Sequence, residues 1–109
     1  MRWVGERRAL TAVARGAAPA DRYIQDGTLL NVYTGECYPA NVAIKGERIA
    51  YVGGRADMVG ARTEVIRARG RILCPGYIEP HSHPWNLVTP AVLARHVLPL
   101  GTTTIFADN

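Results

Sequence analysis

The stretch Pro75-Gly-Tyr-Ile-Glu-Pro-His-Ser-His-Pro84 decides the fold that this sequence predicts. Its apolar beginning indicates a β-strand over residues 77–81, and it ends in two histidines, His81 and His83. Side chains two residues apart on a strand point to the same side of the sheet. If the strand ends at the mouth of a barrel, both imidazoles can reach one metal ion, because TIM-type barrels carry their active sites at the C-terminal ends of their strands.

The residues after this strand complete a strand–helix–strand pattern. Thr89-Pro90 is a typical helix start, because threonine caps free amides and proline suits the first turn. Residues 91–100 carry an apolar stripe, and Gly101 is a typical helix stop. The apolar run Thr102–Ala107 predicts a second strand, so that the two strands should be parallel and joined by a right-handed crossover.

A parallel strand pair cannot form a fold by itself, since it needs cover on both faces and leaves unpaired edges. A complete TIM barrel takes ~250 residues, whereas this sequence has 109. We therefore expect residues 75–109 to be the first βαβ unit of a truncated barrel. On that basis we expect the isolated chain to be inactive and prone to aggregation.

Two segments precede the barrel unit. Apolar residues recur at helical spacing over 3–16, so residues 1–20 are expected to form a helical N-terminal extension. Residues 21–74 contain short β-type runs and read as part of a small antiparallel sheet. Within it, Asp26-Gly27 is expected to be the turn of one hairpin and Lys45-Gly-Glu47 the turn of a second, tighter one. The expected fold class is α/β.

Composition and charge exclude several classes of protein. The chain is 48% hydrophobic and 20% charged, which is ordinary for a globular protein. Its net charge of +4 comes from dispersed arginines with no interleaved aromatics, so we expect no nucleic-acid binding. No apolar run approaches the ~20 residues of a membrane span. Cys37 and Cys74 form no CxxC pair, which favours a reduced, cytoplasmic protein.

The sequence holds too few metal-binding residues for a complete catalytic centre. Zinc-type catalytic sites use three protein ligands and a water. His96 is the only other histidine, and its place in the middle of the predicted helix indicates a surface or interhelical residue. We therefore expect the remaining ligands and the proton-transferring acid beyond Asn109, and no catalytic residue within the chain.

Three further residues are candidates for the surroundings of the site. Glu79 has the same strand parity as the two histidines, and it either orients a ligand histidine or forms a structural ion pair. Trp85 either walls the mouth of the substrate site or packs in the core. Asp108, at the end of the second predicted strand, is expected to cap a loop, with a functional role as the alternative.

Four blocks in order carry a family resemblance. They are Leu30-Asn-Val-Tyr-Thr-Gly-Glu36, Asn41-Val-Ala-Ile-Lys-Gly-Glu-Arg-Ile-Ala-Tyr-Val-Gly53, Pro75-Gly-Tyr-Ile-Glu-Pro-His-Ser-His83 and Leu100-Gly-Thr-Thr-Thr104. Together they resemble the N-terminal part of adenine deaminases, which belong to the metal-dependent amidohydrolase superfamily. The likeness covers residues 20–109.

The resemblance implies a (β/α)8 barrel with a small β-sandwich, of which residues 21–74 would be the N-terminal part. His81 and His83 match the metal ligands of the family, which bind one or two divalent ions of iron, manganese or zinc. The reaction would be hydrolytic deamination of adenine to hypoxanthine and ammonia, using a metal-activated water. The partner would be a small molecule, a purine base, and the full-length protein is expected to be a homo-oligomer.

Two positions differ from the family pattern. Glu79 stands where the superfamily usually has aspartate, and Pro84-Trp-Asn-Leu87 replaces an Ile-Glu-Ser-Ser-like stretch that supplies a carboxylate. A different amine or a cyclic amide therefore stays open as the substrate. The alternatives are a ring-opening amidohydrolase of the dihydroorotase or hydantoinase type, a non-catalytic β-domain, and a basic binding module.

Overall fold

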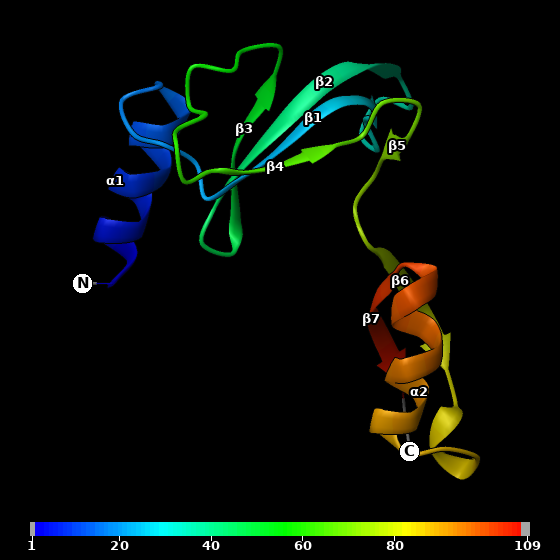
Figure 1. The fold of residues 1–109 in the computed structure, drawn as a ribbon. Helices are drawn as coiled ribbons and strands as arrows, with labels where there is room; N and C mark the ends of the chain where they lie inside the picture. Colours follow the sequence, from blue (N-terminus) through cyan, green and yellow to red (C-terminus); the bar gives the residue numbers. More distant parts are fainter. Residues whose placement is uncertain (1, 108–109) are drawn as a thin grey trace. The chain divides into compact units, whose positions relative to one another are not determined.

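The computed structural model describes residues 2–107, and the chain divides into two compact units on either side of the Cys74–Pro75 bond (Figure 1). The first unit contains α1 (Arg2–Ala14), β1 (Arg22–Leu30), β2 (Cys37–Lys45), β3 (Arg48–Gly53), β4 (Glu64–Arg67) and β5 (Ile72–Leu73). The second contains β6 (Tyr77–Ser82), η1 (Pro84–Asn86), α2 (Pro90–Val97), η2 (Leu98–Leu100) and β7 (Thr102–Ala107). Among the described residues, no helix has the length and apolar character that crossing a membrane requires.

The sheet of the first unit is mixed rather than antiparallel. Its strand order is β3-β2-β1-β4, and β5 also pairs with β1. The pairs β1–β2 and β2–β3 are antiparallel, whereas β4 and β5 run parallel to β1. The expectation of an antiparallel sheet is thus correct for three strands and wrong for two. The cause is the long connection after β3, which brings the chain back to the start of β1 before β4 begins.

The pair Asp26-Gly27 is a bulge inside β1 and not a hairpin turn, so that prediction is wrong. Ile24 pairs with Val42 and Gly27 pairs with Ala40, so β1 advances three residues while β2 advances only two. β1 therefore contains one extra residue at this point. Asp26 adopts φ 62°, a left-handed conformation that aspartate tolerates better than most residues. Its N–H donates to Oδ1 of Asn41 at 2.9 Å, so a side chain on the neighbouring strand satisfies the amide that leaves the ladder.

The core of the first unit lies between α1 and the sheet. Val13, Ala20, Tyr23, Ala43 and Met58 form one buried cluster. The helix α1 packs against β3 and β2 (Figure 1), which confirms the helix expected over residues 3–16. The second predicted hairpin is also confirmed, as β2 and β3 pair on either side of a turn at Gly46-Glu47.

Arg55 fixes the end of α1 to the sheet. Its Nη1 donates to the carbonyl oxygen of Ala14 at 3.1 Å, which satisfies one of the free carbonyls of the last helical turn. Its guanidinium also pairs with Asp57, which raises the pKa of Arg55 and lowers the pKa of the Asp57 carboxyl. In the second turn of α1, Glu6 pairs with Arg48 of β3 at 2.9 Å. Polar contacts therefore tie both the second turn and the last turn of α1 to the rest of the unit.

Asp21 anchors the turn between β2 and β3, and we predict that Asp21→Asn destabilises the protein only above acidic pH. The carboxylate accepts from the Gly46 N–H at 2.8 Å and pairs with Lys45 Nζ at 2.6 Å. These contacts, the Gly46 bond first, lower the pKa of Asp21 below 3.8. The stabilisation is therefore complete above the unfolded pKa and is lost as pH falls through the folded pKa.

For this half-exposed pair we expect a loss of at most about 1 kcal/mol at pH 7. Urea unfolding of both proteins at neutral and at strongly acidic pH measures it. The difference should shrink toward zero in acid. Glu47→Gln, at an exposed position with no ion pair in the described part of the chain, is the control. A difference that stays constant with pH would contradict the prediction.

The second unit is the predicted strand–helix–strand pattern. β6 and β7 pair in parallel, and α2 with η2 lies between them in the chain, which confirms the expected order and strand direction. Pro90 begins α2 as expected, but Thr89 makes no side-chain capping bond. Gly101 ends η2 with φ 99°, a left-handed conformation that favours glycine. Gly76 allows β6 to approach β7, because an added Cβ would lie 2.3 Å from Oγ1 of Thr103.

The described part of the second unit has no fully buried residue. Its large apolar side chains are mostly exposed, with Ile78 at 62%, Phe106 at 63% and Leu100 at 77%. Parallel strands are normally covered on both faces. The exposure of these side chains therefore marks surfaces that this segment does not itself cover.

Candidate metal centre

The imidazoles of His81 and His83 lie side by side at the end of β6. Their Nε2 atoms are 3.0 Å apart. Their ring centroids are 4.6 Å apart, with the ring planes nearly perpendicular at 87°. Both residues are exposed to solvent. The two Nε2 atoms, which share a hydrogen bond, thus converge on one point outside the strand.

Simple strand alternation does not produce this arrangement. The register of β6 against β7 shifts between Glu79 and Ser82. Glu79 pairs with Ile105 and Ser82 pairs with Ala107, so β6 advances three residues while β7 advances two. His83 has already left the strand, with φ −122° and ψ 57°, and precedes the turn η1. The pair therefore depends on an extra residue within β6 and on the turn that begins after it.

The geometry of the pair fits two ligands of one ion. Two ligand nitrogens that each lie ~2.0–2.1 Å from a tetrahedral zinc ion are about 3.3–3.4 Å apart. The observed Nε2 separation of 3.0 Å, which is that of a hydrogen bond between the rings, is a few tenths of an ångström shorter, so a small rotation of the rings brings both nitrogens to ligand distance. Residues 2–107 contain no group of three or more His, Cys, Asp or Glu side chains that could hold an ion. The described chain therefore offers two ligands and not a closed site.

Glu79 lies next to the pair but is not grouped with it as a third ligand. Its Oε1 accepts a hydrogen bond from the backbone N–H of His81 at 3.1 Å. Glu79 also lines a cavity. The other lining residues include Ser82 at the end of β6, His83 directly after it, and Leu93 and Val97 of α2. The Oγ of Ser82 is buried and has no hydrogen-bond partner among residues 2–107. The sequence predicts that Glu79 lies on the same side of the strand as the two histidines, but the register shift between Glu79 and Ser82 breaks the regular alternation on which that prediction depends.

The other candidate residues occupy different positions. Trp85 lies in η1 directly after the histidine pair, is 38% exposed, and lines a hollow formed by residues 85–90. His96 is exposed in the last turn of α2. Asp108 lies outside the described residues.

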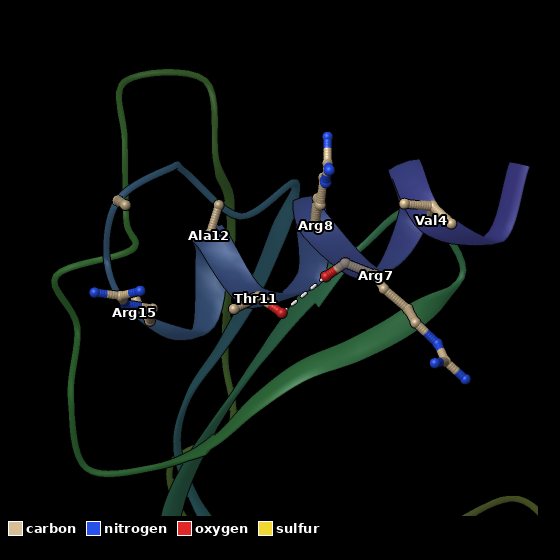
Figure 2. A pocket seen from close by; sticks show the side chains of 7 residues that line it. Val4, Arg7, Arg8, Thr11, Ala12 and Arg15 are labelled. Atoms are coloured by element: carbon tan, nitrogen blue, oxygen red, sulfur yellow. Dashed lines mark hydrogen bonds between the residues drawn. The ribbon is translucent and has the colours of Figure 1, made fainter. Parts of the chain in front are cut away.

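A second hollow lies along α1 and is lined by Arg7, Arg8, Arg15, Val4, Thr11, Ala12 and Ala17. Figure 2 shows that the three arginine side chains point away from one another. The hydroxyl of Thr11 donates to the carbonyl oxygen of Arg7 at 2.9 Å, so it is already used within the helix. Because the positive groups do not converge, we assign no anion site to this surface.

Curated relatives match almost the whole chain. It is 51% identical over 102 residues to an adenine deaminase of Moorella thermoacetica, a match that covers 93% of this chain and 17% of that protein. It is 49% identical over 104 residues to an adenine deaminase of Rubrobacter xylanophilus, again covering 93% and 17%. Identity to an adenine deaminase of Paracoccus denitrificans is 46% over 109 residues, covering 97% and 18%. The chain thus spans less than a fifth of these relatives. No protein-family model matches it.

Solved structures of a D-aminoacylase and of a prolidase resemble the chain in fold. A D-aminoacylase, described as defining a novel subset of amidohydrolases, superposes with a TM-score of 0.66 and 29% identity over 84% of this chain and 19% of that one. The D-aminoacylase structures also include one described by its binuclear metal centre. A prolidase complexed with N-methylphosphonate-L-proline gives a TM-score of 0.61 and 27% identity over 77% and 24% of the two chains.

Proposed function

Since the chain belongs to the adenine deaminase family and corresponds to its N-terminal segment, we propose that it provides the first two metal ligands of an aminohydrolase. The full-length protein would hydrolyse adenine to hypoxanthine and ammonia. The observation that carries this proposal is the convergence of the His81 and His83 Nε2 atoms, 3.0 Å apart, at the end of a strand in a parallel pair.

We propose that the second unit is the beginning of a (β/α)8 barrel. Its parallel strands β6 and β7 are joined through α2, and its apolar side chains are exposed as they would be if later strands and helices covered them. Residues 21–74 would then form the N-terminal part of the β-sandwich, and residues 1–20 a helical extension. Trp85, directly after the ligands, would stand at the mouth of the substrate site.

The role of the two histidines is to hold a divalent ion, of iron, manganese or zinc. Coordination through Nε2 requires neutral imidazoles with the proton on Nδ1. When bound, the ion lowers the pKa of a water toward neutrality and so supplies a nucleophile for hydrolysis. The exposed position of both rings leaves room for further ligands and for substrate.

A hydrolase of an amide bond is the second candidate. The observation that favours it is the fold similarity to D-aminoacylase and prolidase. A ring-opening enzyme acting on a cyclic amide belongs to the same candidate. The departure at Pro84-Trp-Asn-Leu87 from the usual deaminase stretch keeps this alternative open.

The activity test uses the full-length protein loaded with manganese or zinc. We predict that it releases ammonia from adenine and produces hypoxanthine, measured by the change in purine absorbance and by an ammonia assay. Hydantoin and dihydroorotate, tested in parallel, should remain closed. Ring opening without deamination would refute the deaminase proposal in favour of the second candidate.

A further inference from the structure

The backbone amide of His81 has lost its place in the β-ladder. Between Glu79 and Ser82, neither Pro80 nor His81 lies opposite a partner residue on β7. Proline has no N–H to donate. The amide of His81 is therefore the first donor after the interruption, at an exposed position where a nearby side chain or water can accept from it.

That acceptor is the side chain of Glu79. Its Oε1 lies 3.1 Å from the His81 nitrogen. The contact is local, because the Glu79 carboxylate accepts from the backbone amide only two residues later in the chain. It fixes the backbone from which the His81 imidazole projects toward His83.

Among residues 2–107, Glu79 is not grouped with the imidazole pair as a third ligand, and its Oε1 is bonded to the main chain instead. Groups that orient metal ligands typically contribute 10–100-fold, by order of magnitude, to metal affinity. In this protein, Glu79 contacts the main chain of the ligand residue His81 and not its imidazole ring.

We propose that Glu79 is a positioning residue, whose carboxylate holds the bulged main chain of His81 and thereby preserves the pair of imidazoles that binds the metal. This inference rests on the proposed function of the pair. It requires hydrogen-bond acceptance at position 79 and not a negative charge.

Two substitutions of nearly the same size separate acceptance from charge. Glu79→Gln keeps a carbonyl acceptor without the charge, whereas Glu79→Met removes the acceptor. In the full-length protein, we expect Glu79→Met to bind Zn²⁺ roughly 10–100-fold more weakly, measured by competition with a chromophoric chelator. Glu79→Gln should bind close to wild type. Glu64→Ala, which removes an exposed strand glutamate paired with Arg22 in the other unit, is the control and should not change zinc affinity.

A second readout distinguishes positioning from a general loss of structure. With Zn²⁺ in excess, Glu79→Met should regain most of its activity with an unchanged KM, because a residue that acts only by holding the His81 main chain makes no contact with the substrate. Equal zinc affinity of Glu79→Met and wild type would overturn the inference. Glu79→Gln binding as weakly as Glu79→Met would overturn it as well, since charge would then be the cause.

The failure of this inference differs from the failure of the proposed function. His81→Ala serves as the reference in the same titration. If His81→Ala loses zinc and Glu79→Met does not, the metal site stands and the role of Glu79 is wrong. If His81→Ala retains full zinc affinity, the proposed function itself is wrong.

Discussion

Replacement of either His81 or His83 by alanine is expected to lower kcat/KM of the full-length protein by at least about 10³-fold. A catalytic metal contributes several kcal/mol of transition-state stabilisation, and each ~1.4 kcal/mol corresponds to a factor of ten in rate. The two Nε2 atoms converge at 3.0 Å, so each variant leaves the ion with one of the two ligands that this segment supplies. Steady-state kinetics with adenine measures the effect.

His96→Ala is the matched control for this prediction. His96 is also an exposed histidine of the second unit, but it lies in the last turn of α2 and outside the pair. Its replacement should leave kcat/KM unchanged. Near-normal activity of either His81→Ala or His83→Ala would contradict the assignment of the pair as metal ligands.

Tyr23→Ala is expected to cost about 3–5 kcal/mol of unfolding free energy, which is the range for truncating a large buried aromatic side chain. Tyr23 is only 1% exposed and lies in the core cluster with Val13 and Met58. Its hydroxyl donates to the carbonyl oxygen of Arg55 at 2.6 Å. The substitution therefore leaves a cavity and removes an interaction that fixes the segment holding α1.

Urea unfolding measures this loss, and Tyr33→Ala is the control. Tyr33 is 97% exposed, so its truncation should change the unfolding free energy by less than about 0.5 kcal/mol. Tyr23→Phe should cost about 1 kcal/mol, the net value of one hydrogen bond. A loss of less than 1 kcal/mol for Tyr23→Ala, on the order of a single hydrogen bond, would show that the cluster is not the core.

Tyr23 also sets an alkaline limit on stability. Burial raises its pKa above 10.0. The neutral form is favoured in the folded state, so this contribution is complete below the unfolded pKa and is lost as pH rises through the folded pKa. Tyr23→Phe should remove that part of the decline in stability at high pH.

Local sequence signals predicted the elements that local interactions form. The helix α1, the β2–β3 hairpin and the order of β6, α2 and β7 followed from apolar spacing and from turn residues. Asp26-Gly27 has the composition of a hairpin turn, but Asn41 on the neighbouring strand supplies the acceptor that turns it into a bulge. Such a contact between distant residues has no signal in a local pattern.

In the candidate metal site, too, local features were predicted from the sequence, whereas features that depend on pairing with another strand were not. The residue types and spacing of His81 and His83 were enough to identify the pair as a candidate. The interruption of β6 was not predicted, because it depends on the register against β7. The contact from Glu79 to the His81 amide follows from that interruption. Pro80, which has no N–H for a ladder, was the one available sign of it.

The most direct test of the metal site is anomalous diffraction from crystals of the full-length protein grown with Zn²⁺. We predict an anomalous peak about 2.0–2.1 Å from Nε2 of both His81 and His83. A peak that contacts neither histidine, or a zinc-loaded active enzyme in which the two rings point apart, would contradict the account.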